Sequence, residues 1–517
     1  MPQVLGREWT EEEESSGEER AEVREAQREV ATYVARMEVL RPEVMRVTRA
    51  HKALGRCGRA LRSWTDDNYF FGESFASAKI SCFWSHSWHG RRWMKIFSLM
   101  LRYNGLPSAI IGSFTALTMI VLFSCGLLPG LSRLDDNDPR WSTWSLAGGF
   151  AGAVITFFLW RPRQLVFLDR VCISANNVGL KAASIFSLAG ILKKSDQMLV
   201  LWDPTWSDRL WCVFELAAFL KSKATSEQVI IILPTFLGPC SIGLFIGVFL
   251  VMLPATTVPM REHTSWGRYF ILVPLSGTFL LLFISGYVIA AAFRAYFRSV
   301  EKLKKDLSEI SFDETRCSCC DCGHVQRGAH MMCDREIVKE CVSIWFGSEE
   351  AFEDYVRSEV LVTIVAGLHD RTFTRGWSLS VASPILWAFL DIAASHAGYD
   401  NASLDLAIAE GREGMVLWFC CAPMFVDICI FFACRYCQEG NSTCHEILKN
   451  LQLEMVAVVV FSVMAATFVY SHAYSGPERL HSAAQFVGGW SIMALFHVFF
   501  RVSRQSGACH LFRLRSG

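Results

Sequence analysis

Long apolar stretches alternate with charged segments along the chain. A helix needs about 20 predominantly apolar residues to cross the ~30 Å hydrocarbon core of a bilayer. Eight stretches approach or exceed this length, and we expect each to be a spanning helix: residues 105–130, 144–160, 232–258, 269–293, 379–395, 415–434, 455–474 and 483–500. Long and short connections alternate between them, which predicts four helical hairpins. The second and fifth stretches are short enough to be buried helices of a soluble domain instead.

Basic side chains indicate which connections face the cytoplasm, because Lys and Arg are enriched on that side of a membrane. They concentrate in the long connections and in the C-terminal tail, at Arg91, Arg92, Lys95, Arg102, Arg161, Arg163, Arg294, Arg298, Lys302, Lys304, Lys305, Arg501, Arg504, Arg513 and Arg515. We therefore expect both termini in the cytoplasm, on a membrane whose identity the sequence does not give. Asn401, in a short link, begins a glycosylation triplet that belongs on the opposite, outer or lumenal face.

The composition points to an integral membrane protein. Hydrophobic residues make up 52% of the 517 residues and charged residues 19%, against about 25% charged in an average soluble domain. The 50 basic and 50 acidic residues cancel, which excludes a nucleic-acid binder held by bulk positive charge. An ordinary soluble enzyme and a mostly disordered chain are excluded as well. The lipid bilayer is the predicted partner.

The spans divide the chain into segments. We expect a charged N-terminal helical arm at 1–52, hairpins at 105–160 and 232–293, a cytosolic Cys-rich helical segment at 294–378, four further spans within 379–500 and a basic tail at 501–517. Apolar residues recur at helical spacing in the arm, at Val23, Ala26, Val30, Tyr33, Met37 and Leu40. They cover about two and a half heptads, fewer than a coiled coil needs. We expect this helix to dock on the protein's own soluble domain, with self-association as the alternative.

Two segments flanking the first hairpin, residues 74–104 and 161–231, together predict one α/β module. Short apolar strands are expected at 79–84, 165–168, 198–202 and 229–233, and helices at 178–192 and 210–221. Strands that alternate with helices form a parallel sheet, and such sheets bind ligands at the carboxyl ends of their strands. The expected fold class is a multi-pass α-helical membrane protein with a parallel-sheet α/β module split by a membrane hairpin.

The second helix of this module carries the pattern Trp-Cys-x-x-Glu-Leu, at Trp211, Cys212, Glu215 and Leu216. It follows the third expected strand, while the sequence SHSW follows the first strand and VFLDRVCI follows the hairpin. These residues resemble the Toll/interleukin-1 receptor (TIR) domain, and the likeness is greatest to multi-pass TIR-like membrane proteins of unicellular algae. The resemblance covers about a fifth of the chain.

The resemblance implies one of two activities. TIR domains either self-associate as signalling adaptors or cleave NAD between nicotinamide and ribose, and in the catalytic members the Glu of this helix is essential. That role falls on Glu215, whose carboxylate can bind ribose hydroxyls and stabilise a developing oxocarbenium ion. Ser85, Asp169 and Trp211 are the candidate substrate contacts.

Two features depart from the TIR pattern. Family members have a fifth strand and a final helix, whereas here the fourth strand runs directly into the third expected span. The loop after Asp169 also lacks the usual family sequence. A surface carboxylate paired with Arg209 or Lys221 is the alternative for Glu215. The leading expectation is a membrane-anchored TIR-like signalling or interaction protein that can self-associate through this module, and the first alternative is an NAD hydrolase.

The Cys-rich segment is dense in ligands for soft metals. Zinc prefers four Cys or His ligands separated by short spacers. Two-residue gaps occur between Cys317 and Cys320 and between Cys319 and Cys322, and we expect Cys317, Cys320, His330 and Cys333 as the candidate zinc ligands. Reduced cytosolic thiols and palmitoylated cysteines are the alternatives.

Three ionisable residues lie inside the expected spans: Asp391, Asp427 and His497. Intramembrane carboxylates are costly and commonly functional, so a channel or transporter working through Asp427 is the second alternative function. His497 is the more plausible partner of Asp427. Asp391 and Asp427 fall at different depths of their spans, which argues against a shared ion site. An interhelical hydrogen bond that fixes packing is the plainer interpretation of each of these residues.

Overall fold

The computed structural model describes residues 17–61, 68–130, 141–223, 230–257, 267–326, 329–330, 332–364, 373–397, 404–437, 442–472, 482 and 484–495. The chain folds into two compact units, each assembled from three separate segments. Unit 1 comprises Met1–Leu99, Arg161–Gly238 and Ser299–His369, and unit 2 comprises Met100–Trp160, Pro239–Arg298 and Asp370–Gly517. The N-terminal arm and the Cys-rich segment therefore belong to the same unit as the α/β module.

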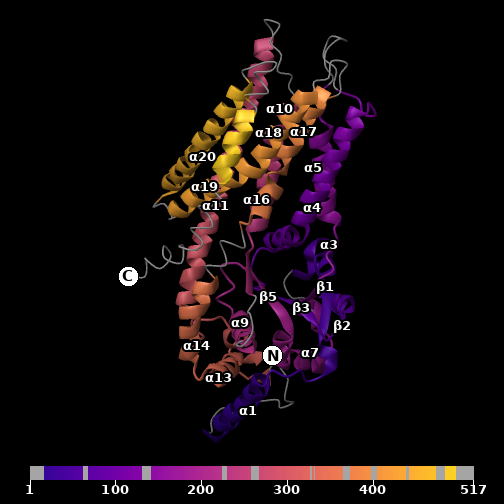
Figure 1. Ribbon diagram of the computed structural model, residues 1–517. Helices are drawn as coiled ribbons and strands as arrows, with labels where there is room; N and C mark the ends of the chain where they lie inside the picture. Colours follow the sequence, from indigo (N-terminus) through magenta and orange to yellow (C-terminus); the bar gives the residue numbers. More distant parts are fainter. Residues whose placement is uncertain are drawn as a thin grey trace. The chain divides into compact units, whose positions relative to one another are not determined.

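Unit 1 is built on a six-stranded sheet with the strand order β2-β1-β4-β3-β5-β6. Figure 1 labels β1, β2, β3 and β5 of this sheet. The strands are β1 (Arg46–Arg49), β2 (Phe75–Ala76), β3 (Ile80–His86), β4 (Leu165–Phe167), β5 (Ser195–Trp202) and β6 (Ile230–Pro234). β3 through β6 are parallel, and β1 pairs antiparallel with both β4 and β2. The sheet is therefore mixed, because the N-terminal region adds an antiparallel edge that the apolar pattern did not indicate.

The four parallel strands lie in the order 2-1-3-4 when they are numbered along the chain. The direction of winding therefore reverses between β3 and β5, and this reversal is where open α/β sheets place their ligands. β3 and β5 pair in register from Ile80↔Ser195 to His86↔Leu201. Trp84 and Trp202 near their ends are almost fully buried, and Phe83 stacks on Phe167 of β4 with ring centroids 5.0 Å apart.

Four helices follow β4 and β5: α6 (Asp169–Cys172), α7 (Val178–Phe186), α8 (Leu188–Lys193) and α9 (Leu210–Ser222). The helix expected at 178–192 is divided at Ser187, whose hydroxyl accepts a hydrogen bond of 3.0 Å from the amide of Leu40. α9 coincides with the expected helix at 210–221. Its apolar residues are buried nearly all round, so it is a core helix of unit 1.

The N-terminal helix α1 (Gly17–Ala35) docks within unit 1. It packs on α13 (Asp334–Phe346), where Trp345 Nε1 donates to the carbonyl of Ala35 at 2.9 Å. The remaining short elements of this unit are η2 (Pro42–Val44), α2 (Ala50–Ala53), α3 (Gly55–Gly58), η3 (Arg59–Leu61), η4 (Asn68–Glu73), α12 (Ser318–Asp321), β7 (Val325–Gln326), β8 (Ala329–His330), α14 (Glu349–Tyr355) and the π-helical turn η5 (Val356–Val360).

Unit 2 is helical in its described residues. Its elements are the larger part of α4 (Arg92–Ser124), α5 (Trp144–Leu159), α10 (Leu237–Thr257), most of α11 (Gly267–Ser308), α16 (Arg375–Val381), α17 (Ser383–Ala397), α18 (Leu404–Val416), the π-helical turn η6 (Leu417–Cys421), α19 (Ala422–Arg435), α20 (Thr443–His472) and a helix at Ala484–Leu495. Each of the eight expected spans overlaps one of these helices.

Within the described residues, three helices are long and apolar enough to cross a membrane: Arg92–Ser124, Leu237–Pro254 and Leu404–Arg435. α16 and α17 form a fourth candidate if the bent pair is one span, and Trp144–Leu159 and Ala484–Leu495 are shorter apolar helices. The helix Arg92–Ser124 begins well before the expected start at residue 105, because its first residues belong to unit 1 and the helix continues from there without a break.

The span expected at 379–395 is bent rather than straight. α16 and α17 meet at an angle of 51° next to Ala382. Pro384 lies in the first turn of α17, where its ring has no N–H to donate and clashes with the preceding turn. The helix therefore restarts at Ser383 instead of continuing.

Small residues allow α4, α5 and α17 to pack closely around Trp387. This side chain is fully buried, and its Nε1 donates to Ser113 Oγ at 3.1 Å. A Cβ added to Gly149 of α5 would come within 2.6 Å of the Trp387 ring, and one added to Gly112 of α4 within 2.8 Å of the Gly149 carbonyl. The glycines therefore create the space that the indole fills.

Gly149→Ala is expected to lower the thermal stability of the protein in detergent. The added methyl group overlaps the Trp387 ring, and overpacking of this kind costs about 1–3 kcal/mol, which corresponds to a fall of several degrees in Tm. Gly243→Ala on α10 is the matched control, because nothing lies within 4 Å of its added Cβ. Equal melting temperatures for the two variants would contradict this packing.

Candidate functional site

The carboxyl ends of β3, β4 and β5 bring polar residues together at the winding reversal. Ser85 and His86 end β3, Asp169 follows β4 after one residue, and Asp203 directly follows β5. Glu215 comes from the second turn of α9, which follows β5 along the chain. Parallel strands end at a common edge, so residues distant in sequence form one candidate site.

Glu215 is held in a short hydrogen-bonded chain. Ser85 Oγ donates to Glu215 Oε2 at 2.5 Å, and Trp206 Nε1 donates to Ser85 Oγ at 3.0 Å. Trp206 is almost completely buried, whereas Glu215 keeps partial access to solvent. The indole and the hydroxyl thus fix the carboxyl group while a part of it stays accessible.

His86 and Asp169 form the second part of the site. His86 is buried, and its Nε2 lies 3.8 Å from Asp169 Oδ1, too far for a hydrogen bond. Among the described residues, Nε2 has no hydrogen-bond partner. The Asp169 carboxylate accepts from the amide of Arg170 at 2.7 Å and remains partly exposed. A buried polar atom without a partner next to an accessible carboxylate is a place where a polar ligand group or water can bind.

Polar residues around Asp203 form the third part of the site. Its carboxylate lies 3.6 Å from Lys95 Nζ, and its Oδ1 lies 2.5 Å from the hydroxyl of Thr205. Thr205 Oγ1 is also 2.7 Å from Ser87 Oγ, and the Lys95 ammonium donates to the Ser87 carbonyl. A Cβ added to Gly90 would overlap the Asp203 carboxylate, so only glycine allows this approach.

Burial shifts the proton affinities of the central groups. It raises the pKa of Glu215 to about 8, an effect that the hydrogen bond from Ser85 opposes and the charge of Asp169 reinforces. Burial also raises the pKa of Asp169 to about 6, against hydrogen bonds from Arg170 and Trp88. The pKa of His86 falls to about 3, because its ring is buried and Lys95 is near. At neutral pH the site therefore holds a neutral imidazole, a protonated Glu215 and an ionised Asp169.

The structure brings the candidates Glu215, Ser85 and Asp169 to the same edge of the sheet. Trp211 points elsewhere: its ring lies 5.5 Å from that of Phe214, and it donates a hydrogen bond to the Asp334 side chain. The alternative partners of Glu215 are also engaged elsewhere, Arg209 with Ser318 and Lys221 with the Trp345 carbonyl.

Sequence reasoning missed His86, Asp203 and Trp206 at this site. Asp203 could have been found, because it directly follows a buried strand in the same way that Asp169 follows β4. The role of Trp206 depends on the turn between β5 and α9, which carries no recognisable sequence pattern.

The Cys-rich segment gathers two groups of potential metal ligands. Cys319, Cys320, His324 and Cys333 form one, and Cys317, Cys319 and Asp334 form the other. Three of the expected zinc ligands, Cys317, Cys320 and Cys333, belong to these groups. The side chain of His330 lies outside the described residues, and His324 occupies the place of the imidazole.

Asp391 is a fully buried carboxylate of α17 that caps another helix. It accepts hydrogen bonds of 2.8 Å from the amides of Ser145 and Leu146 in the first turn of α5, and one of 2.6 Å from Ser142 Oγ. These amides have no partner within their own helix. Asp391 thus fixes the packing of α5 on α17.

The other candidate residues, from the expected spans and the links between them, are placed as follows. Asp427 lies on α19, whereas His497 and Asn401 lie outside the described residues. Glu454 on α20 was not anticipated, because it precedes the expected seventh span by one residue. It is 1% exposed, its carboxyl oxygens have no hydrogen-bond partner among the described residues, and it packs against Gly286 of α11.

Comparison with known proteins adds no relative. No protein-family model matches the chain, and no curated protein and no solved structure is found that resembles it. The function is therefore argued from the geometry of the site.

Wild-type stability is expected to fall relative to Glu215→Gln as the pH rises from about 4.5 to about 8. The folded protein keeps the Glu215 proton up to about pH 8, whereas the unfolded chain releases it near 4.5. The contribution of the protonated Glu215 carboxyl group to folding stability is complete below about pH 4.5, decreases above it and is lost as the pH passes about 8. Melting curves between pH 5 and 9 should show the stability of the variant relative to the wild type increasing steadily with pH and levelling off above about pH 8, where the difference amounts to several degrees. Glu353→Gln, at an ion pair with Arg357 far along the chain from the site, is the control. A pH-independent difference for Glu215→Gln would refute the assignment.

Asp391→Ala is expected to destabilise unit 2, because it leaves two amides of the first turn of α5 buried without an acceptor. Loss of a helix cap costs about 0.5–2 kcal/mol and an unpaired buried donor about 1–3 kcal/mol. Thermal unfolding in detergent measures the effect, and Asp391→Asn, which retains one acceptor oxygen, should recover part of it. A variant as stable as the wild type would show that these hydrogen bonds do not support the fold.

Proposed function

We propose that this chain is a membrane-anchored TIR-like protein whose α/β unit cleaves the bond between nicotinamide and ribose in NAD, with Glu215 as the catalytic carboxyl group. The observation that carries the proposal is the hydrogen bond between Ser85 at the end of β3 and Glu215 on α9, at the winding reversal of the sheet. It joins two of the three sequence segments on which the resemblance to TIR domains depends, SHSW and the Trp-Cys-x-x-Glu-Leu helix.

The arrangement of the sheet supports this assignment. The order 2-1-3-4 of the parallel strands directs ligands to the carboxyl ends of β3 and β5. Glu215, Asp169 and His86 lie there with strongly shifted pKa values, which is typical of catalytic and ligand-binding groups.

The chemistry requires one carboxylate and one water molecule. The C–N bond between ribose and the positively charged nicotinamide breaks, and nicotinamide leaves as a neutral molecule with the bonding electron pair. The ribose carbon becomes oxocarbenium-like, and the Glu215 carboxylate stabilises it through charge and through the ribose hydroxyls. Water then adds to this carbon and releases a proton, which gives ADP-ribose.

The cationic substrate itself favours the reactive form of Glu215. The pKa of the carboxyl group is about 8 without ligand, and a pyridinium ring nearby lowers the pKa of an acid by favouring its charged form. Binding of NAD therefore promotes release of the Glu215 proton at neutral pH.

The membrane topology belongs to the same proposal. Eight spans with both termini in the cytoplasm would place the α/β unit and the Cys-rich segment on the cytoplasmic side, where NAD is available. A signalling or interaction protein that uses the same TIR-like module without catalysis is the second candidate. It is supported by the described part of the sheet, which has four parallel strands and in which β6 leads directly to α10 instead of to a fifth parallel strand.

NAD turnover by the purified full-length protein in detergent is expected to be at least about 100-fold lower in Glu215→Gln, because loss of a preorganised group that stabilises the transition state costs this much. Ser85→Ala should reduce turnover less and move the acid limb of the pH–rate profile upward, since it removes the hydrogen bond that lowers the pKa of Glu215. Release of nicotinamide is the measured quantity.

Glu353→Gln serves as the control and should turn over NAD like the wild type, because Glu353 lies on α14 in an ion pair with Arg357. Turnover that persists in Glu215→Gln would remove Glu215 from the mechanism. The absence of turnover in monodisperse wild-type protein would favour the interaction protein instead.

A further inference from the structure

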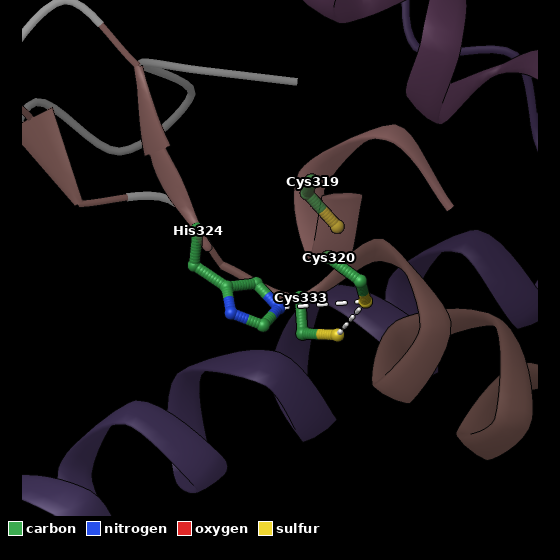
Figure 2. Close-up of side chains that lie close together, drawn as sticks. All are labelled: Cys319, Cys320, His324 and Cys333. Atoms are coloured by element: carbon green, nitrogen blue, oxygen red, sulfur yellow. Dashed lines mark hydrogen bonds between the residues drawn. The ribbon is translucent and has the colours of Figure 1, made fainter. Parts of the chain in front are cut away.

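Three thiols and one imidazole converge in the Cys-rich segment of unit 1. Cys319 and Cys320 lie on the short helix α12, His324 follows it, and Cys333 is the residue directly before α13. Figure 2 shows the His324 ring and the thiols of Cys320 and Cys333 turned toward one another. The four ligand atoms all lie within 4.8 Å of one another.

Two distances within this group match the edges of a zinc tetrahedron. Zinc–sulfur bonds of about 2.3 Å and zinc–nitrogen bonds of about 2.0 Å at tetrahedral angles give S···S edges of about 3.8 Å and S···N edges of about 3.5 Å. The Cys320 and Cys333 sulfurs are 3.7 Å apart, and Cys320 Sγ is 3.5 Å from His324 Nε2. A disulfide would bring two sulfurs to about 2.05 Å, and the cysteines of this cluster are free.

The backbone is shaped to present His324. Gly323 and His324 have φ angles of +65° and +60°, in the left-handed region that a residue with a Cβ rarely adopts. The turn is held by hydrogen bonds from the Gly323 amide to the Cys320 carbonyl at 3.1 Å and from the His324 amide to the Cys319 carbonyl at 2.8 Å. Such strain persists where the surroundings fix it, typically at a functional site.

A donor outside the ligand set supports Cys319 as a thiolate ligand. The amide of Asp334 donates to Cys319 Sγ at 3.2 Å, and hydrogen bonds of this kind orient and stabilise metal-bound sulfur. The second group fits zinc less well, because its Cys317 and Cys319 sulfurs are 3.0 Å apart, shorter than a tetrahedral edge of about 3.8 Å.

We propose that Cys319, Cys320, His324 and Cys333 bind one structural zinc ion. Four protein ligands close the coordination sphere and leave no position for substrate, which distinguishes structural from catalytic zinc. The ion would join α12 to the start of α13, two elements that otherwise share few hydrogen bonds.

The zinc ion would also support α9, the helix that carries Glu215. Arg316, one residue before Cys317, exchanges backbone hydrogen bonds with the turn that begins α9: its amide donates to the Asp208 carbonyl at 2.6 Å, and its carbonyl accepts from Leu210 at 3.3 Å. Asp334, next to Cys333, accepts a hydrogen bond from Trp211. The attachments to the start of α9, at Arg316 and Asp334, thus lie on either side of the four metal ligands in the sequence.

The test measures zinc bound to the purified full-length protein by elemental analysis. About one zinc per chain is expected in the wild type, and His324→Ala and Cys333→Ser should each lose most of it. Cys322→Ser is the matched control and should keep the metal, because Cys322 lies in the same turn but outside the ligand set. Full zinc in His324→Ala together with loss in His330→Ala would overturn the proposed set.

Replacement of zinc by Co²⁺ in the wild type gives a readout that does not depend on the folding of a variant. A tetrahedral site with three thiolates should show strong sulfur-to-cobalt charge-transfer bands in the near ultraviolet and intense d–d bands in the visible range. A spectrum of six-coordinate cobalt, or a chain that retains neither metal under reducing conditions, would overturn the proposal. Neither measurement depends on NAD turnover.

Discussion

The parallel pairing of β3 with strands that lie beyond the inserted helices α4 and α5 is the constraint on which the candidate site depends. β3 is the central strand, yet both of its neighbours, β4 and β5, follow the 61 residues of Met100–Trp160 that belong to unit 2. Ser85 and Asp169 reach one edge only because the chain leaves unit 1 after β3 and returns as β4. Within the hairpin, Asn104 Nδ2 donates to the Phe157 carbonyl at 2.7 Å. This bond holds the exit and return of the chain close together, so that the insertion adds little loop entropy to the folding of the sheet.

The elements of the α/β unit were predictable where apolar runs are short and bounded. The four parallel strands and α9 agree with the sequence within a few residues, because buried central strands consist of continuous apolar residues. β1 and β2 could not be predicted in this way. β1 is short and mostly polar and β2 has only two residues, and they join the sheet because β1 pairs with the edge of β4 and β2 pairs with β1. The residues of the candidate site were likewise predictable only where they belong to a sequence pattern. Glu215, Ser85 and Asp169 belong to recognisable motifs, whereas Trp206 enters through the geometry of a turn.

Unit 2 shows how much of the structure composition alone can predict. Helices occur at all eight apolar stretches, but length and hydropathy identify only three of the described helices as able to span, or four with the bent pair. The bend at Ala382 depends on a single proline, and the capping of α5 by Asp391 depends on a contact between residues about 250 positions apart. The energetic cost of burying a carboxylate in an expected span was the reason to consider a function for Asp391. Its hydrogen-bond partners show instead that it supports the packing of two helices.

Burial outweighs the local charges at the carboxyl ends of β3, β4 and β5. Lys95 faces Asp203 and donates to the Ser87 carbonyl, and the charges of Arg170 and Lys95 favour the ionised form of Asp169. Burial nevertheless raises the pKa of Asp169, and it also raises the pKa of Glu215, on which the charge of Asp169 acts in the same direction. Burial of carboxyl groups beyond what nearby charges compensate lowers stability. A partly accessible group of carboxyls that carries this cost suits a ligand with its own positive charge, such as the nicotinamide ring of the proposed substrate.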